Sequence, residues 1–171
     1  KEEENLCLRA YHLLRQAYSL KPVNIHLHKI IPTGAGLGGG SSDAAWSLRV
    51  LNEIFQLKLS QESLKSLAGQ LGSDCHFFVE DRPMIGAGRG DKLHPVASVL
   101  KDLYLVIIRP DVHVSTSEAY AGVYPGTPAK DLEEIIEYVT IDQWKDQLVN
   151  DFEESIFRSF PEIGDLKGRL Y

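Results

Sequence analysis

The chain has 171 residues, enough for one well-packed core or for two small domains that share an interface. Its apolar content of 43% and its charged content of 25% are those of an ordinary globular protein. Eighteen basic and twenty-four acidic residues give a net charge of −6, which argues against non-specific binding to nucleic acid or to an anionic membrane.

Cysteine usage and hydropathy indicate the compartment. Cys7 and Cys75 are too few for a disulfide framework and favour a reducing environment. No run of residues is long and apolar enough to span a bilayer, and the first residues, Lys-Glu-Glu-Glu-Asn, do not resemble a signal peptide. We therefore expect a cytoplasmic protein.

The first elements are a helix and a strand. Apolar residues recur at helical spacing over residues 3–18, and Lys21-Pro22 ends the pattern. Residues 23–28 alternate between apolar and polar, which predicts a half-buried strand. Its inward residues are Val23, Ile25 and Leu27. His26 and His28 share the outer face, where a metal site is conceivable, but no third ligand is apparent and polar residues are usual on a solvated face.

A glycine-rich stretch follows at residues 31–45, which read IPTGAGLGGGSSDAA. Glycines allow tight turns that present successive N–H groups, and the N-terminus of the next helix adds unpaired N–H groups and a positive dipole end. Together these favour phosphate binding. The stretch is not a Walker A loop, because no Lys follows its last glycine, and it is not a dinucleotide-binding fingerprint, because no acidic residue closes a second strand at the right distance. By itself it also fits a glycine-rich surface loop before a capped helix.

Two helices come next. Apolar spacing predicts one over residues 42–55, capped by one of residues 41–43. Ser60 is the expected cap of a second helix, which Gly72 ends.

An acidic residue, Asp74, stands in an apolar segment directly after that helix. From the residues alone, it is equally a turn residue bonded to local backbone N–H groups and a functional acid. We expect the segment to be extended, so that Cys75 and His76 point to opposite faces. Cys75 is then a packed thiol rather than a reactive thiolate paired with His76.

The remaining patterns divide the chain in two. Residues 84–91 are glycine-rich and predict a hairpin, in which Arg89 is either a phosphate contact or, as we favour, a solvated charge. Residues 103–108 predict a buried strand. A new unit is expected to begin just before it, which gives domains 1–97 and 98–171.

The last part of the chain is predicted to be helical. Ser115 and Glu118 form a capping box that opens a helix through Tyr120. Three further helical segments are expected near residues 129–139, 142–149 and 151–159. Pattern alone therefore indicates an α+β arrangement.

Two segments resemble a known family. Residues 32–45 resemble the phosphate-binding motif of the GHMP kinases, and the triple glycine followed by Ser-Ser-Asp-Ala-Ala is most similar to the 4-diphosphocytidyl-2-C-methyl-D-erythritol kinases of the non-mevalonate isoprenoid pathway. Residues 72–78 resemble the family segment Gly-Ala-Asp-Val-Pro-Phe-Phe, although Cys75-His76 stand where Val-Pro is common. Residues 85–91 resemble a glycine-rich family segment near the ligand.

The resemblance implies a two-domain α+β GHMP-kinase fold, with an ATP-binding N-terminal domain over residues 1–97, part of the C-terminal domain over residues 98–171, and the ligands in the cleft between them. It implies that Asp74 is the catalytic base, that Ser42 helps to bind Mg²⁺, and that Thr116 and Tyr120 line the substrate pocket, with Tyr120 near the cytidine. The last two equally fit a helix cap and a core aromatic. The residues expected to hold ATP are Pro32, Gly34, Gly36, Leu37, Gly38, Gly39, Gly40, Ser41 and Ser42.

The implied reaction is ATP-dependent phosphorylation of a hydroxyl of 4-diphosphocytidyl-2-C-methyl-D-erythritol, a small molecule; no nucleic-acid or membrane partner is expected. Family chains are longer, and neither their N-terminal Lys segment nor their late glycine-rich motif has a counterpart here, so we expect a fragment or a reduced descendant. Two alternatives remain. Another GHMP kinase, of homoserine or mevalonate type, is disfavoured by the triple glycine with Asp43, and a non-catalytic nucleotide-binding module has no need of Asp74.

Overall fold

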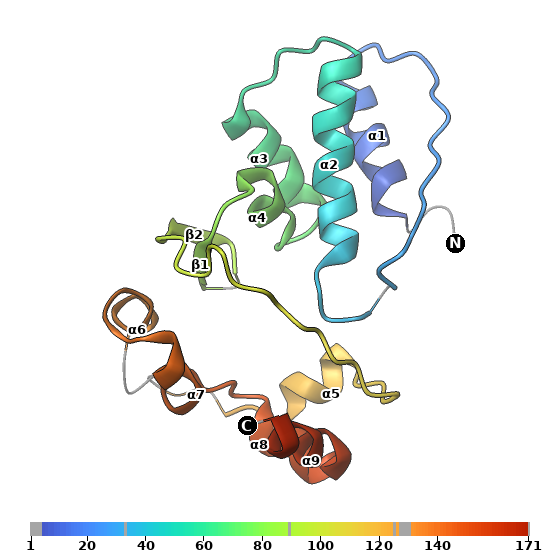
Figure 1. Cartoon of the computed structure of the whole chain (residues 1–171). Coiled ribbons are helices and arrows are strands. Elements are labelled where there is room, and N and C mark those ends of the chain that lie inside the picture. Colours follow the sequence, from blue (N-terminus) through green and yellow to red (C-terminus); the bar gives the residue numbers. More distant parts are fainter. Residues whose placement is uncertain (1–4, 33, 89, 125, 127–130, 171) are drawn as a thin grey trace. The chain divides into compact units, whose positions relative to one another are not determined.

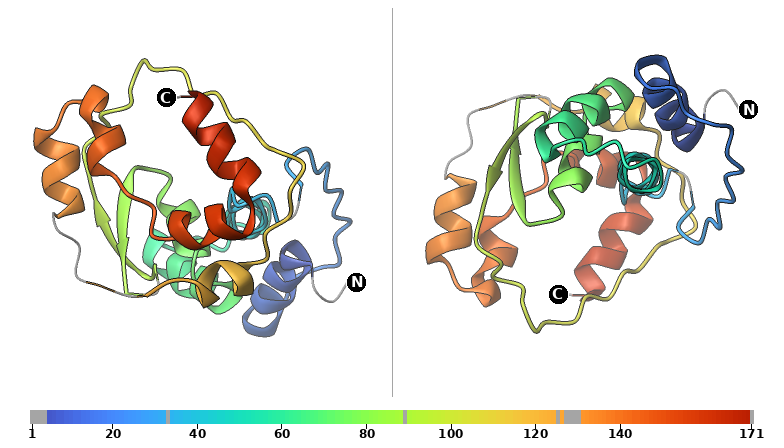
Figure 2. Two further views of the ribbon diagram at one scale, coloured as in Figure 1. Left: turned by 90° about the horizontal axis from the view of Figure 1, so that it is seen from below. Right: turned by 90° about the horizontal axis from the view of Figure 1, so that it is seen from above.

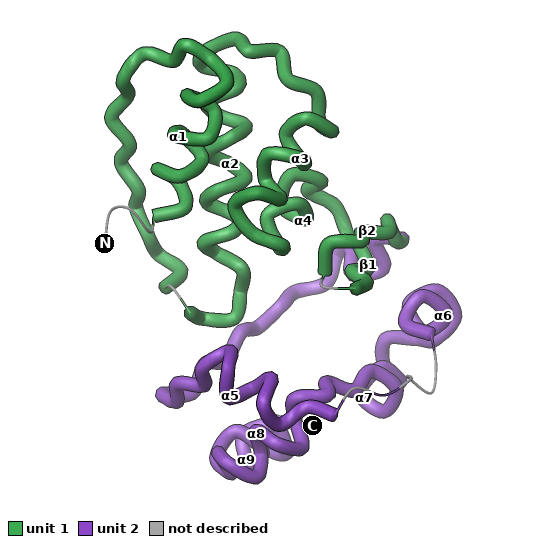
Figure 3. The backbone as a smooth tube through the Cα atoms, turned by 180° about the vertical axis from the view of Figure 1, so that it is seen from behind, with its two compact units in different colours: residues 1–96 green, residues 97–171 purple. Residues whose placement is uncertain are grey.

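The computed structural model describes residues 5–32, 34–88, 90–124, 126 and 131–170 (Figure 1). The chain divides into two compact units, residues 1–96 and 97–171 (Figure 3). The assignment of residues 1–97 and 98–171 to the two family domains stays a prediction. None of the helices in the described part of the chain combines the length and the apolar character that a membrane crossing requires.

In its described residues, unit 1 is a group of four helices followed by a hairpin. Its elements are α1 (Leu6–Ala17), α2 (Gly39–Ile54), α3 (Gln61–Leu71), α4 (Cys75–Glu80), β1 (Met84–Ala87) and β2 (Lys92–Pro95). The longest helix, α2, packs against α1, α3 and α4. Figure 2 shows α2 nearly end-on, with α1 on one side and α3 and α4 on the other. The helix that follows the glycine-rich loop is therefore the centre of this unit.

Small side chains let α2 approach its neighbours closely. Ala44, Ala45 and Leu48 are fully buried on α2, where they meet Leu14 of α1 and Ala68 of α3 in one apolar cluster. Cores of this kind are held by apolar surface removed from water and by close packing. The apolar stripes expected for these three helices are thus confirmed, and they fix the position of the N-terminus of α2.

Two helix starts in unit 1 have a side-chain cap of the kind that helix N-termini favour. Asn5 caps α1, and Ser60 caps α3 as predicted, its hydroxyl accepting from the N–H of Ser63. The expected cap of α2 within residues 41–43 is wrong: α2 begins at Gly39, with Gly38 at its N-cap in the left-handed region. The apolar pattern misplaced this end because glycines adopt helical and left-handed backbone without adding an apolar signal.

Both predicted strands outside the hairpin are wrong. Residues 23–28 have extended backbone without a strand partner in the described part of the chain, and Ile25 and Leu27 are 41% and 42% exposed. Residues 103–108 are also unpaired among the described residues, and Tyr104 is 100% exposed. Alternating or apolar runs describe side chains that suit a sheet, but a ladder also needs a neighbouring strand.

The hairpin and the buried thiol are confirmed, whereas the extended segment before the hairpin is wrong. Residues 75–80 form the short helix α4, in which Cys75 is fully buried. Cys7 and Cys75 are both free thiols. The strands β1 and β2 are antiparallel, with Met84 opposite Pro95 and Ala87 opposite Lys92. Arg89 lies outside the described residues.

Unit 2 consists of short helices in the part that the structure describes. They are α5 (Thr116–Ala121), α6 (Leu132–Tyr138), the 3₁₀ helix η2 (Ile141–Gln143), α7 (Trp144–Gln147), α8 (Glu153–Ser159) and α9 (Pro161–Leu170). The capping box of α5 is confirmed, with Ser115 and Glu118 bonded reciprocally. The three helices expected from sequence correspond to α6, α7 and α8, each shorter than predicted. Sequence reasoning missed α9, whose Gly164 and Gly168 lower helix propensity.

Candidate active site

The glycine-rich loop has the backbone that only glycine adopts readily. Gly34, Gly36 and Gly38 have φ angles of 76°, 72° and 62°. A β-carbon on Gly38 would lie 2.8 Å from Cζ of Phe78, whereas one on Gly36 would meet nothing within 4 Å. Position 38 therefore requires glycine for two reasons, a left-handed backbone and close contact with an aromatic ring. Position 36 requires it only for the backbone.

The N-terminus of α2 keeps its backbone donors available. Gly38 has no side chain to cap the helix, and no side-chain cap bond is present at this end in the described structure. The first intrahelical bond runs from the N–H of Ser42 to the carbonyl of Gly38 at 2.9 Å. The earlier N–H groups, with the positive end of the helix dipole, form a donor set suited to phosphate.

Asp74 occupies the turn between α3 and α4. Its carboxylate makes no capping bond to α4; Oδ1 instead accepts from the hydroxyl of Ser73 at 2.9 Å, and the side chain is exposed. The sequence left two roles open for Asp74, a turn residue bonded to local N–H groups and a functional acid. The absence of a capping bond from Asp74 to α4 gives no support to the first role. An exposed carboxylate held by one hydroxyl is free to meet a ligand.

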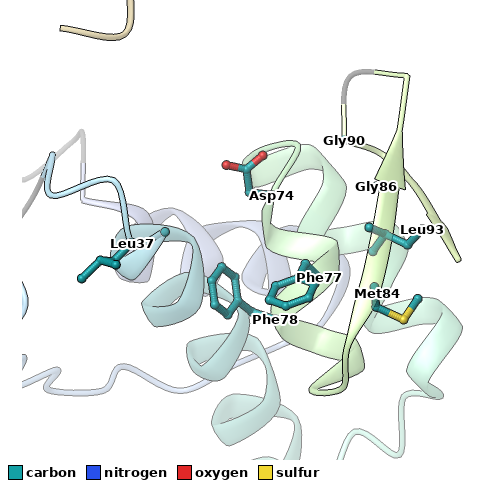
Figure 4. A pocket seen from close by; sticks show the side chains of 9 residues that line it. Leu37, Asp74, Phe77, Phe78, Met84, Gly86, Gly90 and Leu93 are labelled. Carbon is teal, nitrogen blue, oxygen red and sulfur yellow. The ribbon is translucent and has the colours of Figure 1, made fainter. Parts of the chain in front are cut away.

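A pocket of about 290 Å³ brings the loop and the acid together within unit 1 (Figure 4). Leu37 lies on one side and the hairpin on the other, with Phe77 and Phe78 between them and Asp74 above the rings. The lining residues are Leu37, Gly38, Asp74, Phe77, Phe78, Met84, Gly86, Gly90 and Leu93. An apolar floor with one carboxylate at its rim is typical of a site that orients a small ligand.

A buried thiol lies between Asp74 and the first turn of α2. Burial raises the pKa of the Cys75 thiol, a bond with the Ser41 hydroxyl lowers it in part, and the neighbouring Asp74 carboxylate raises it. Cys75 therefore stays protonated and acts as a small packing residue.

The predicted site residues fall into two groups. Those of the loop and Asp74 lie in unit 1: Leu37, Gly38 and Asp74 line the pocket, while Gly39–Ser42 form the first turn of α2 and Pro32, Gly34 and Gly36 lie on the exposed part of the loop. Thr116 and Tyr120 lie on α5 in unit 2. Tyr120 instead packs edge-on against Phe152, with ring centroids 5.1 Å apart.

Sequence reasoning missed the apolar floor and one cation. Phe77 and Phe78 were part of a recognised segment, but nothing in their spacing assigned them to a pocket wall. Lys29 stands three residues before Pro32, and its ammonium group lies 2.7 Å from Oδ2 of Asp43. Only the position of a basic residue just before the loop could have indicated it. The described residues contain no group of three or more His, Cys, Asp and Glu side chains that could hold a metal ion.

Comparison with known proteins identifies the family. Residues 5–81 match the model described as the GHMP kinases N terminal domain. A curated protein of Bacteroides thetaiotaomicron, named 4-diphosphocytidyl-2-C-methyl-D-erythritol kinase, is 47% identical over 169 residues, which are 99% of this chain and 61% of that protein. The chain belongs to the GHMP kinases.

Further similarity comes from the same branch of the GHMP kinases. A protein of the same name from Cytophaga hutchinsonii is 46% identical to this chain. The match covers 98% of this chain and 62% of that protein. A solved structure, entitled crystal structure of 4-(cytidine 5'-diphospho)-2C-methyl-D-erythritol kinase, matches with a TM-score of 0.73 at 32% identity, over 97% of this chain and 61% of that one. The chain thus spans about three fifths of the length of these relatives.

Proposed function

We propose that the protein acts as an ATP-dependent kinase that phosphorylates a hydroxyl of 4-diphosphocytidyl-2-C-methyl-D-erythritol, the substrate in the names of its relatives. The observation that carries the proposal is one pocket lined both by Gly38, at the start of the phosphate helix, and by the Asp74 carboxylate. A phosphoryl donor and its acceptor must meet in such a place, because the enzyme contributes mainly position and charge.

The phosphate end of the site is the N-terminus of α2. Its uncapped N–H groups would hold the phosphates of ATP, and the glycines before it would let them approach the backbone. Magnesium keeps most of its waters and needs only one or two protein oxygens beside phosphate. By the family resemblance, the Ser42 hydroxyl in the first turn of α2 would supply one such oxygen. When bound, the ion would neutralise charge on the phosphates.

The acceptor end is Asp74. Its exposed carboxylate would orient the substrate hydroxyl and take its proton as the phosphoryl group arrives, a role that typically contributes about 10²–10⁴-fold in rate. Ser73 donates to Oδ1, which leaves Oδ2 for the substrate. The rings of Phe77 and Phe78 beneath would limit the water around the reacting atoms.

The cytidine contacts rest on the family resemblance. Tyr120 presents an exposed ring that Phe152 holds edge-on, and Thr116 begins the same helix. Tyr120→Leu should raise the KM for the cytidine substrate several-fold and leave the KM for ATP unchanged. An equal change in the KM values for the cytidine substrate and for ATP would show that Tyr120 does not contact the substrate.

The test of the proposed function is ADP release with Mg²⁺-ATP and 4-diphosphocytidyl-2-C-methyl-D-erythritol. Asp74→Asn should lower kcat by about 10²–10⁴-fold. Asp81→Asn is the matched control, because Asp81 ends the same helix α4, lies in a left-handed conformation that Asn tolerates, and does not line the pocket.

The assay is run on the chain as given and on a chimera extended at both ends with the flanking segments of the Bacteroides thetaiotaomicron relative. Turnover that disappears with Asp74→Asn supports the proposal. Nucleotide binding without turnover in either protein, unchanged by Asp74→Asn, would instead identify a binding module. The same assay with homoserine and mevalonate as acceptors tests the remaining alternative, another GHMP kinase of homoserine or mevalonate type.

A further inference from the structure

An ion pair joins the two ends of the glycine-rich loop. Nζ of Lys29, two residues before the glycine-rich stretch, lies 2.7 Å from Oδ2 of Asp43, in the second turn of α2. The two side chains are 27% and 26% exposed, so water screens this pair less than it screens a fully exposed one. Thirteen residues separate them, including the three glycines with positive φ.

The position of the ammonium group is set by the helix itself. A β-carbon on Gly39 would lie 2.9 Å from Nζ of Lys29 and 3.4 Å from Cγ2 of Ile31. Lys29 therefore stands directly over the first residue of α2 and reaches past it to Asp43. A cation near a helix N-terminus is unfavourable on its own account, because it opposes the helix dipole. The carboxylate of Asp43 is what makes this position favourable.

We propose that Lys29 and Asp43 form a clamp that closes the glycine-rich loop and holds the first turns of α2 in place before any ligand arrives. Glycines lose more conformational freedom than other residues when they are ordered, so this loop needs fastening. A pair that joins its two ends limits that freedom in the folded chain. Lys29 and Asp43 are thus positioning residues that act through the backbone of the loop.

The test is amide hydrogen exchange of the ligand-free chain. Lys29→Met should speed exchange of the N–H groups of residues 42–45 by about two- to fivefold, the range expected for a partly exposed ion pair. Asp43→Asn should do the same, and the double variant should exchange no faster than either single one, because both remove one interaction.

The direction of the Lys29→Met effect decides the matter. If Lys29 were only a cation beside the helix, removing it would relieve the repulsion with the dipole and slow the exchange. Slower or unchanged exchange overturns the clamp, as do two single effects that add. Lys21→Met is the matched control, since it removes the same charge from the same extended segment; it should change nothing at residues 42–45.

Amides of α3 report whether the variants remain folded. If Lys29→Met also speeds exchange throughout α3, Lys29→Gln and Lys29→Arg replace it. The clamp then requires faster exchange at residues 42–45 with Gln and a rate nearer the original with Arg, which retains the charge. Equal rates for Gln and Arg overturn it.

A second measurement relates the clamp to nucleotide and rests on the proposed function. Both single variants should weaken Mg²⁺-ATP binding by about two- to fivefold. Asp43→Asn is the informative one, because removing a negative charge beside bound phosphates would otherwise strengthen binding. Tighter binding overturns the role of the clamp in nucleotide binding. Absence of ATP binding by the unaltered chain would count against the proposed function and would leave the exchange result standing.

Discussion

Gly38 shows at the scale of one residue how the loop depends on glycine. It needs a left-handed backbone and also lies against Phe78, whereas Gly36 needs only the backbone. Gly36→Ala should therefore cost about 1 kcal/mol of unfolding free energy, the usual penalty for that conformation. Gly38→Ala should cost about 1 kcal/mol more, because the ring of Phe78 must move.

Urea unfolding of the two alanine variants measures that difference. Equal losses for Gly36→Ala and Gly38→Ala would show that Phe78 yields without strain. Because Phe78 lines the pocket, a ring displaced by Gly38→Ala should also weaken ligand binding more than Gly36→Ala does.

The environment of Glu80 should make the stability of the protein depend on pH. Its side chain is 7% exposed, and Oε1 accepts from Nζ of Lys65 at 2.7 Å. The bond from Lys65 holds the pKa of Glu80 below its usual value, although burial opposes this shift. A carboxylate with a depressed folded-state pKa stabilises the protein above its unfolded pKa, and that contribution is lost as the pH falls through the folded value.

Stability should therefore decline as the pH falls through about 4.3, the ordinary pKa of an unfolded Glu, where half of the unfolded chains carry the proton. Urea midpoints between pH 3 and pH 7 test this. Glu80→Gln should make the loss of stability at low pH smaller. Glu62→Gln should leave that loss nearly unchanged, because Glu62 pairs with the same lysine through a side chain that is largely exposed. The same dependence of stability on pH in both variants would contradict the assignment of this effect to Glu80.

The residues of the site differ in how far sequence could find them. Asp74 and the loop glycines were recognised because their identities form a motif along the chain. Phe78 and Lys29 were not, since what matters in each is a contact with a residue distant in sequence: Phe78 with Gly38, and Lys29 with Asp43. A single sequence shows which residue types are present but not which of them meet.

At the scale of elements, α3 is a helix whose start was predicted correctly, and its cap is testable. The Ser60 hydroxyl accepts from the N–H of Ser63 at 3.2 Å. Ser60→Ala should cost about 1 kcal/mol of unfolding free energy. Ser66→Ala, at an exposed position inside the same helix, should be neutral or slightly stabilising, because Ala has the higher helix propensity. Circular dichroism during thermal unfolding measures both, and equal losses would deny Ser60 its capping role.

Helices were predicted better than strands for a physical reason. The hydrogen bonds of α1 and α3 lie within each segment, so a local apolar pattern and a cap suffice to indicate them. The hairpin succeeded because its two strands are neighbours in sequence. Residues 23–28 and 103–108 have the side chains of strands but no strand partner among the described residues, and a partner is not a local property.

At the scale of the whole molecule, the core is unevenly shared. Of the fifteen buried apolar residues described, fourteen lie in unit 1 and only Ile135 lies in unit 2. Burial of apolar surface is the main favourable term in folding. The cooperative unfolding of this chain should therefore be a property of unit 1, which also holds the pocket and Asp74.

A chain cut after residue 96 tests this division. Residues 1–96 should keep the cooperative transition of the full chain, whereas residues 97–171 should unfold without one, since they bury too little apolar surface to offset the entropy of ordering. Leu48→Ala, in the centre of the core, should lower the unfolding free energy by about 2–5 kcal/mol in both the full chain and residues 1–96. Ile135→Ala is the matched control and should leave the main transition of the full chain in place. If the isolated 1–96 segment lost its transition, or if Ile135→Ala shifted the transition as far as Leu48→Ala does, stability would depend on both units, and the proposed site would have to be studied in the undivided chain.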